Sequence, residues 1–188
     1  MEHVKKILFF GILGGVAIYD SLLIFSIAKP QLRFWPPPPK TSWRHDVMRV
    51  AGVVGPLSIV GMLVLGVLDW DSFAWRHWSR FVVGGFLFAS GGAFALWGFF
   101  GLGVTASQGL GGPLLVGGAY RYSRNPQYVG AVVGLLGYAV MCNSTLTLAA
   151  AVLWSSWYLL APFAEEPWLH EHLGARFAEY AARVRRYL

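Results

Sequence analysis

The sequence predicts an all-α, polytopic membrane protein of about five transmembrane helices, with a C-terminal amphipathic helix covering its cytosolic face. Its 188 residues are 56% hydrophobic and only 13% charged, with a mean hydropathy of +0.52. This balance is typical of membrane proteins and excludes an ordinary soluble enzyme. The connections are too short for a separate soluble domain, so we predict one membrane domain over 1–188, with N-terminal spans in 1–100 and a core in 101–188. The predicted spans are 7–28, 50–68, 81–100, 128–142 and 145–163.

The first span follows Lys5-Lys6, as the apolar region of a signal peptide would. It is longer than such a region and no clear cleavage site follows it, so we predict a retained helix. Asp20 lies inside this span. An acid within a membrane helix often marks a site, and Asp20 is therefore a secondary candidate. The lone cysteine, Cys142, excludes an internal disulfide.

A proline run separates the first two spans, where Trp35 is followed by four prolines at 36–39. Proline cannot continue a helix and restricts the residue before it, so this segment is extended. We expect a stiff stretch along the lipid headgroups, and a substrate-lining role is the alternative.

Glycines recur in the third and fourth spans, where small residues let membrane helices approach closely. Helix packing is therefore the expected role of Gly84, Gly85, Gly91, Gly92, Gly130, Gly134 and Gly137. The connection 101–127 carries seven further glycines, including Gly101 and Gly103. Long loops in compact proteins are often functional, and glycine lets the backbone approach a ligand. No dinucleotide-binding fingerprint is present.

The fourth and fifth spans form a predicted hairpin. Residues 127–164 contain no charge, and this stretch is too long for one crossing of about 20 residues. Asn143-Ser144 supplies a natural break. The hairpin brings the Arg124-Asn125-Pro126 corner and the adjacent acids Glu165 and Glu166 to one membrane face. Two adjacent acids at a membrane boundary are energetically costly, so a functional role is the better explanation for them.

The tail from Pro167 predicts an amphipathic helix whose N-terminus follows the two acids. Apolar residues recur at three and four positions, as a helix on the membrane surface or over a pocket would require. They are Trp168, Leu169, Leu173, Phe177, Tyr180, Val184 and Leu188.

The distribution of Lys and Arg predicts the orientation. The connections 29–49 and 101–127 and the tail 164–188 hold eleven of these residues, and the other side holds four. The richer side should be cytosolic, in contact with anionic lipid. The N-terminus is then outside, although Lys5-Lys6 argues against that. No sequence feature of a nucleic-acid-binding fold is present.

Charges of both signs meet at the predicted site. Glu165 and Glu166 suit a cationic ligand group. Arg121 and Arg124 suit a carboxylate or a phosphate. The nearby tyrosines suit an aromatic ring or a cation. The set fits a zwitterionic, ring-bearing cation such as S-adenosylmethionine. The five histidines lack the spacing of a zinc site, so no metal is expected.

Three motifs in order resemble the integral-membrane methyltransferases. They are the run from Gly118 to Gly130, Glu165-Glu166, and the pattern from Leu173 to Arg186, so the resemblance covers 99–188. This superfamily includes isoprenylcysteine carboxyl methyltransferases and phospholipid N-methyltransferases. The resemblance implies S-adenosylmethionine-dependent methylation of a lipid or lipophilic acceptor, in a bacterial inner membrane or the endoplasmic reticulum.

The resemblance also implies residue roles. Glu165 and Glu166 would bind the amino end of S-adenosylmethionine, with Glu166 the stronger candidate. Arg124 and Tyr128 would be catalytic, with Arg124 orienting an anion and Tyr128 one possible base. The remaining cofactor-binding residues would be Gly101, Gly103, Tyr120, Asn125 and Pro126, together with Tyr128.

The acceptor stays open between a phospholipid amine and an isoprenylcysteine-type carboxylate. The isoprenylcysteine branch usually has His where this chain has Asn125, which favours the phospholipid branch, whereas the tail pattern is more similar to the isoprenylcysteine branch. Two alternatives remain: a non-enzymatic binding or scaffold protein, and a lipid or sterol reductase sharing the C-terminal half. The oligomeric state is also open.

Overall fold

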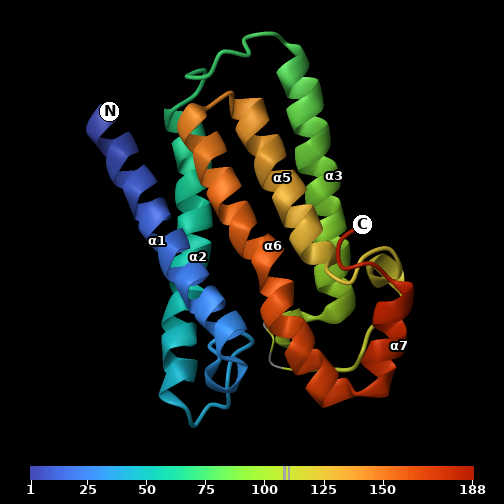
Figure 1. The fold of residues 1–188 in the computed structure, drawn as a ribbon. Helices are drawn as coiled ribbons and strands as arrows, with labels where there is room; N and C mark the ends of the chain where they lie inside the picture. The colour runs from blue at the N-terminus through green and yellow to red at the C-terminus, as the bar shows by residue number, and fades with distance from the viewer. Residues whose placement is uncertain (108, 110) are drawn as a thin grey trace.

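The computed structural model describes residues 1–107, 109 and 111–188, and within them the chain is helical with no strand (Figure 1). Four helices are long and apolar enough to cross a membrane, and a fifth apolar helix, α5, is shorter. The all-α prediction is confirmed. The elements are α1 (Glu2–Ala28), η1 (Pro30–Leu32), α2 (Trp43–Leu68), α3 (Ser79–Leu102), α4 (Val104–Ser107), η2 (Gly118–Arg121), α5 (Pro126–Cys142), α6 (Thr145–Leu173) and α7 (Ala175–Arg183).

The helix α6 lies at the centre of the bundle, with α1 and α2 on one side and the α3–α5 pair on the other (Figure 1). A continuous core joins α1, α2, α5 and α6, and Leu23, Met62 and Ala150 are fully buried in it. Large apolar side chains such as Ile7, Phe86 and Phe100 are exposed on the outside. An apolar exterior of this kind suits lipid rather than water.

Glycines set the close approach of α3 and α5, as predicted for Gly84, Gly91, Gly130, Gly134 and Gly137, whereas the packing role predicted for Gly85 and Gly92 is wrong. A Cβ atom added at Gly91 would lie 2.5 Å from the backbone nitrogen of Gly134, and one at Gly84 would lie 2.6 Å from that of Met141. Neighbouring Gly85 and Gly92 meet nothing within 4 Å. One glycine face of α3 therefore packs backbone to backbone on α5, and the other face points outward.

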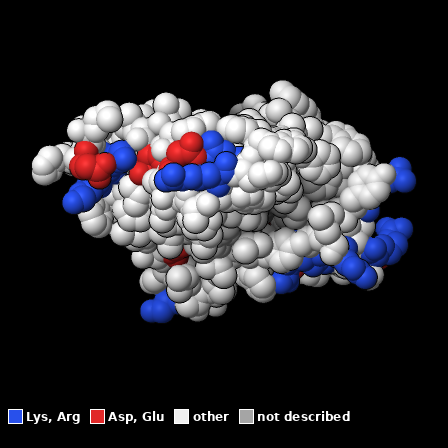
Figure 2. All heavy atoms as spheres, turned by 90° about the horizontal axis from the view of Figure 1, so that it is seen from above, with Lys and Arg blue, Asp and Glu red and all other residues white. Residues whose placement is uncertain are grey.

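The α5–α6 turn lies at the predicted break. Asn143 adopts the left-handed conformation, which its short polar side chain tolerates, and Ser144 caps α6 by accepting a hydrogen bond of 3.0 Å from the Thr147 amide. We call this region, together with residues 69–80 and the start of α1, the turn end. Figure 2 views it from above, with acidic and basic side chains next to each other.

The predicted boundary after the hairpin is wrong. The helix α6 continues past 163, through Pro162 and Pro167, to Leu173. The acids Glu165 and Glu166 thus lie within α6 and not at the start of a tail helix. A proline inside a helix removes one hydrogen bond, and here tertiary contacts on both sides of Pro167 outweigh that loss. Gly174, at φ +56°, ends α6.

The tail is consequently a short helix and an extended end, not one helix over 167–188. The amphipathic element is α7, which runs back toward the start of α5 (Figure 1). Its Phe177 and Tyr180 are buried against Tyr120. We call the region formed by the connection 101–125, residues 165–174 and α7 the motif end, opposite the turn end.

Candidate functional site

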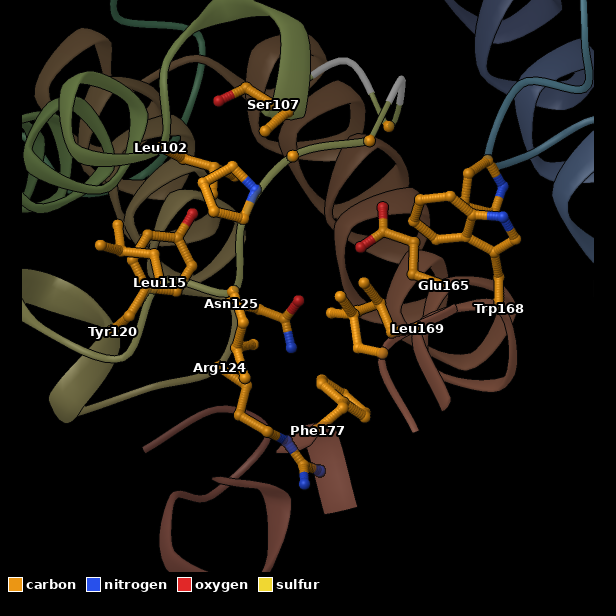
Figure 3. Close-up of a pocket in the computed structure, with 18 of the residues that line it drawn as sticks. Leu102, Ser107, Leu115, Tyr120, Arg124, Asn125, Glu165, Trp168, Leu169 and Phe177 are labelled. Atoms are coloured by element: carbon orange, nitrogen blue, oxygen red, sulfur yellow. The ribbon is translucent and has the colours of Figure 1, made fainter. Parts of the chain in front are cut away.

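A cavity of about 230 Å³ opens at the motif end. Its walls come from the proline run after α1, the glycine-rich connection, the starts of η2 and α5, the last turns of α6, and α7. In Figure 3, Glu165 and Trp168 stand on one side, and Tyr120 and Leu115 on the other. The lining residues include Pro36, Ser107, Gly109, Gly111, Gly112, Leu115, Tyr120, Arg124, Asn125, Gln127, Tyr128, Glu165, Trp168, Leu169, His172, Phe177 and Tyr180.

Glu165 presents a carboxylate to this cavity. Its Oε1 accepts a hydrogen bond of 2.6 Å from the Trp35 indole Nε1 and a second from the Tyr128 hydroxyl. Both donors are neutral, and among the described residues no Lys, Arg or His lies within ion-pair distance of Glu165. The carboxyl group is therefore hydrogen-bonded by neutral donors and has no cation partner among the described residues, so a cationic ligand group would stabilise its charged form.

Glu166, one residue further along α6, has a different environment. Its Oε1 lies 3.0 Å from Arg124 Nη2 and accepts a hydrogen bond of 2.8 Å from Arg186 Nε, while Arg186 Nη2 lies 2.7 Å from Oε2. Glu166 does not line the cavity. Two arginines neutralise this carboxylate, so the residue that the sequence favoured for the cofactor joins α6 to the C-terminal segment.

The Arg124-Asn125 corner also holds the C-terminal segment. The Arg124 amide donates to the Arg185 carbonyl at 2.9 Å, its Nη1 donates to the Ala181 carbonyl at 3.0 Å, and Asn125 Nδ2 donates to the Arg186 carbonyl at 2.9 Å. Figure 3 shows the Arg124 side chain extending away from Asn125 and Glu165. Arg124 and Asn125 line the cavity, but their polar ends fasten α7 and the residues after it.

A polar network forms the wall opposite Glu165. Gln127 Nε2 donates to Ser107 Oγ and to the Tyr120 hydroxyl, both at 2.9 Å, and the Tyr180 hydroxyl donates to the Tyr120 carbonyl at 2.7 Å. Burial raises the pKa of Tyr120 and that of Tyr180 to about 12. Both phenols stay protonated near neutral pH, and Tyr120 retains a hydrogen for a ligand acceptor.

The cavity does not include three of the residues singled out from the sequence, Gly101, Gly103 and Pro126. Gly101 packs near Leu115, and Pro126 is buried against Gly98. The glycines that line the cavity come later in the connection, at 109, 111 and 112. Gly109 has φ +69°, a conformation that favours glycine.

Two other sequence candidates lie away from the cavity. Asp20 accepts a hydrogen bond of 2.6 Å from Ser156 on α6, so it joins two helices. Arg121 is exposed and lies over the Tyr122 ring.

Nothing in the sequence pointed to Gln127 or His172 as site residues. For the proline run after Trp35, a position along the headgroups is the expectation and a substrate-lining role the alternative, and the structure places Pro36 in the cavity wall and Trp35 against Glu165. Phe177 belongs to the predicted tail helix, for which a position over a pocket is one of the two expectations.

The donor set fits S-adenosylmethionine. The cationic amino end of this molecule matches an un-neutralised carboxylate, and its adenine matches aromatic walls such as Trp168 and Phe177. Glycine-rich backbone offers further polar contacts. Among the described residues, no three His, Cys, Asp or Glu side chains gather as a metal ion would require.

Comparison with known proteins identifies a family. The pattern that defines the phospholipid methyltransferase family matches residues 79–176, just over half of the chain. No curated protein and no solved structure matches the chain. The match covers α3 to the start of α7 and so contains most of the cavity. The chain therefore belongs to the phospholipid methyltransferase family, within the integral-membrane methyltransferase superfamily.

Proposed function

We propose that this protein transfers a methyl group from S-adenosylmethionine to a lipid acceptor at the membrane surface. The observation that carries the proposal is the Glu165 carboxylate, which faces the cavity with two neutral donors and no neutralising cation. Family membership supports the reaction class. The cavity chemistry supports the choice of methyl donor.

Glu165 would hold the ammonium of the methyl donor, and the Tyr120–Gln127 wall would meet its polar groups. The bound molecule supplies a methyl group on a positively charged sulfur. The protein's contribution is to position the reactants between the cavity walls, to which Trp168 and α7 contribute. Alignment of this kind can lower a barrier by roughly 7–11 kcal/mol in favourable cases.

Tyr128 and Arg124 take positioning roles in this proposal. The Tyr128 hydroxyl is engaged as a donor to Glu165, and the Arg124 guanidinium pairs with Glu166 and the Ala181 carbonyl. Neither group is free to remove a proton from an acceptor. Tyr128 holds the Glu165 carboxylate, which would bind the methyl donor. Arg124 holds α7, which lines the cavity.

A calorimetric titration of the detergent-purified protein with S-adenosylmethionine and with its product S-adenosylhomocysteine tests the cofactor. We expect saturable binding of both, weakened at least about 100-fold in Glu165→Gln, because a charge-assisted contact to the ligand is lost. The matched control is Glu179→Gln, an exposed carboxylate on α7. Absence of binding by the folded wild type would contradict the proposal and favour a non-enzymatic protein.

The acceptor is proposed to be a phospholipid amine, whose neutral form would attack the methyl carbon. The N–CH3 bond forms as the S–CH3 bond breaks, S-adenosylhomocysteine leaves, and the amine proton passes to water. Asn125 stands at the corner of the motif and the family match names phospholipids, whereas a carboxylate acceptor rests on the tail pattern alone. Transfer of a tritiated methyl group to vesicles containing phosphatidylethanolamine, and to an isoprenylated cysteine in parallel, tests this choice. Label in the amine lipid only is the expected result. Label in the cysteine compound only would overturn it.

A further inference from the structure

Trp35 belongs to the connection between α1 and α2, outside residues 79–176 that match the family. Its indole Nε1 nevertheless donates to Glu165 Oε1 at 2.6 Å, across 130 positions of sequence. The neighbouring Pro36 lines the cavity. The N-terminal half therefore supplies both a wall of the cavity and a hydrogen-bond donor to its central carboxylate.

The backbone of this connection is held firmly at the end of α1. The amides of Phe34 and Trp35 both donate to Ser26 Oγ, at 2.9 and 3.0 Å. On its other side the proline run packs against the glycine-rich connection, since a Cβ atom at Gly109 would lie 3.1 Å from Pro36. The position of Trp35 is thus determined by contacts that do not involve Glu165.

Aromatic packing orients the indole. The Trp35 ring meets the Trp157 ring edge to face, with centroids 5.5 Å apart, and Trp157 meets Tyr128 at 5.6 Å. Trp35 and Tyr128, the two donors to Glu165, therefore flank one tryptophan of α6. Both donate to the same oxygen, Oε1. This arrangement restrains the carboxylate rotamer, and no side chain of the described residues donates to Oε2, which a ligand can then use.

We infer that Trp35 is a positioning residue, which holds the Glu165 carboxylate in the orientation that binds the amino-acid end of the methyl donor. The inference rests on the proposed function and adds that binding of the methyl donor by Glu165 depends on Trp35. Trp35 lies outside the region that matches the family, and Glu165 lies inside it. Both halves of the chain therefore contribute to recognition of the amino-acid end.

The test compares two ligands in Trp35→Phe, which keeps an aromatic ring and removes the indole N–H. S-adenosylhomocysteine carries the amino-acid end, whereas methylthioadenosine lacks it. We expect affinity for S-adenosylhomocysteine to fall about tenfold, since one hydrogen bond to a charged group is lost, and affinity for methylthioadenosine to stay unchanged. An equal loss for both ligands, or none, would overturn the inference.

Trp154→Phe is the matched control. Trp154 lies in the same aromatic cluster on α6, and its indole nitrogen is buried without a hydrogen-bond partner among the described residues. Its replacement removes similar ring area and should leave the affinity ratio of the two ligands at the wild-type value. If Trp35→Phe does not fold, benzothienylalanine at position 35 exchanges only the N–H for sulfur, and the same loss is expected.

A double substitution separates the two proposals. In the Glu165→Gln background, Trp35→Phe should cause no further change in the ratio, because both changes act on one contact. An additional loss there would contradict the inference about Trp35. Wild-type protein that binds neither ligand would contradict the proposed function itself. Wild-type binding with an unchanged ratio in Trp35→Phe would contradict the inference about Trp35 alone.

Discussion

The two ends of the α5–α6 hairpin use carboxylates in opposite ways. At the turn end, Asp69 accepts from Ser72 at 2.6 Å and from Ser144 at 2.8 Å and pairs with Lys5, and Asp71 pairs with Arg80. Asp69 and Asp71 each have a cation and close a connection between helices. At the motif end, two adjacent acids divide the roles, because Glu166 is paired with arginines and Glu165 is not.

This difference teaches which carboxylate is structural and which is available to a ligand. A carboxylate neutralised by neighbouring cations gains little from an ammonium, whereas one held by neutral donors beside a cavity has no cation of its own and gains more from a ligand that brings one. In the proposed function, stabilising the fold and binding the methyl donor therefore fall to different residues, Glu166 and Glu165, although the two are neighbours in sequence.

The largest loss of stability should follow from disrupting the contact between α3 and α5, which runs between the turn end and the motif end. Gly91→Leu would force a side chain against the α5 backbone, so we expect a loss of more than about 3 kcal/mol of stability. Gly92→Leu, which meets open space, should change stability by less than about 0.5 kcal/mol. Melting temperature and monodispersity in detergent measure both. Equal damage by the two substitutions would contradict the packing described for α3 and α5.

A smaller loss should follow from Glu166→Gln. The substitution leaves Arg124 and Arg186 without their carboxylate, and we expect a cost of about 2 kcal/mol for these partly buried pairs. The C-terminal segment should then be cleaved faster by trypsin. Glu179→Gln is the control, since it replaces an exposed carboxylate on α7 and removes no trypsin site. Unchanged melting and proteolysis in Glu166→Gln would show that Glu166 does not fasten the tail.

The smallest effect is expected at the turn end, from Asp71→Asn. Hydrogen bonds from Arg80 hold the pKa of Asp71 below its ordinary value. The stability that this pair contributes is complete above the ordinary pKa and is lost as pH falls through the lowered one. The variant should melt at a slightly lower temperature near neutral pH, lose part of its sensitivity to acid, and bind S-adenosylhomocysteine as the wild type does. Weakened binding would mean that the two ends are not independent.

Much of the fold could be predicted because it depends on residues close together in sequence, such as turn residues, helix caps and glycine patterns. Asn143 tolerates the left-handed conformation and Ser144 caps a helix, so the hairpin break can be read from two residues. The glycines of α3 and α5 likewise mark a close contact. The continuation of α6 through Pro167 could not be predicted, because the local rule for proline gives the opposite answer and contacts distant in sequence decide it.

The sequence brings Glu165 and Glu166 to one end of the hairpin, and the structure shows a cavity there that Glu165 lines and Glu166 does not. Adjacent residues on a helix point about 100° apart, so only one of Glu165 and Glu166 can face the cavity directly. Which one does so depends on the rotation of α6 against α1 and α7, and no pattern within the motif reports that rotation. The contact between Trp35 and Glu165 could not be predicted either, because it too depends on how the helices pack and joins residues 130 positions apart.

The central claim is that Glu165, and not Glu166, binds the amino-acid end of the methyl donor. The most direct test is the affinity ratio of S-adenosylhomocysteine to methylthioadenosine, measured for Glu165→Gln and Glu166→Gln below the melting temperature of both. The ratio should fall to about one in Glu165→Gln, because the contact that distinguishes the ligands is gone. It should keep the wild-type value in Glu166→Gln. The reverse pattern would contradict the claim.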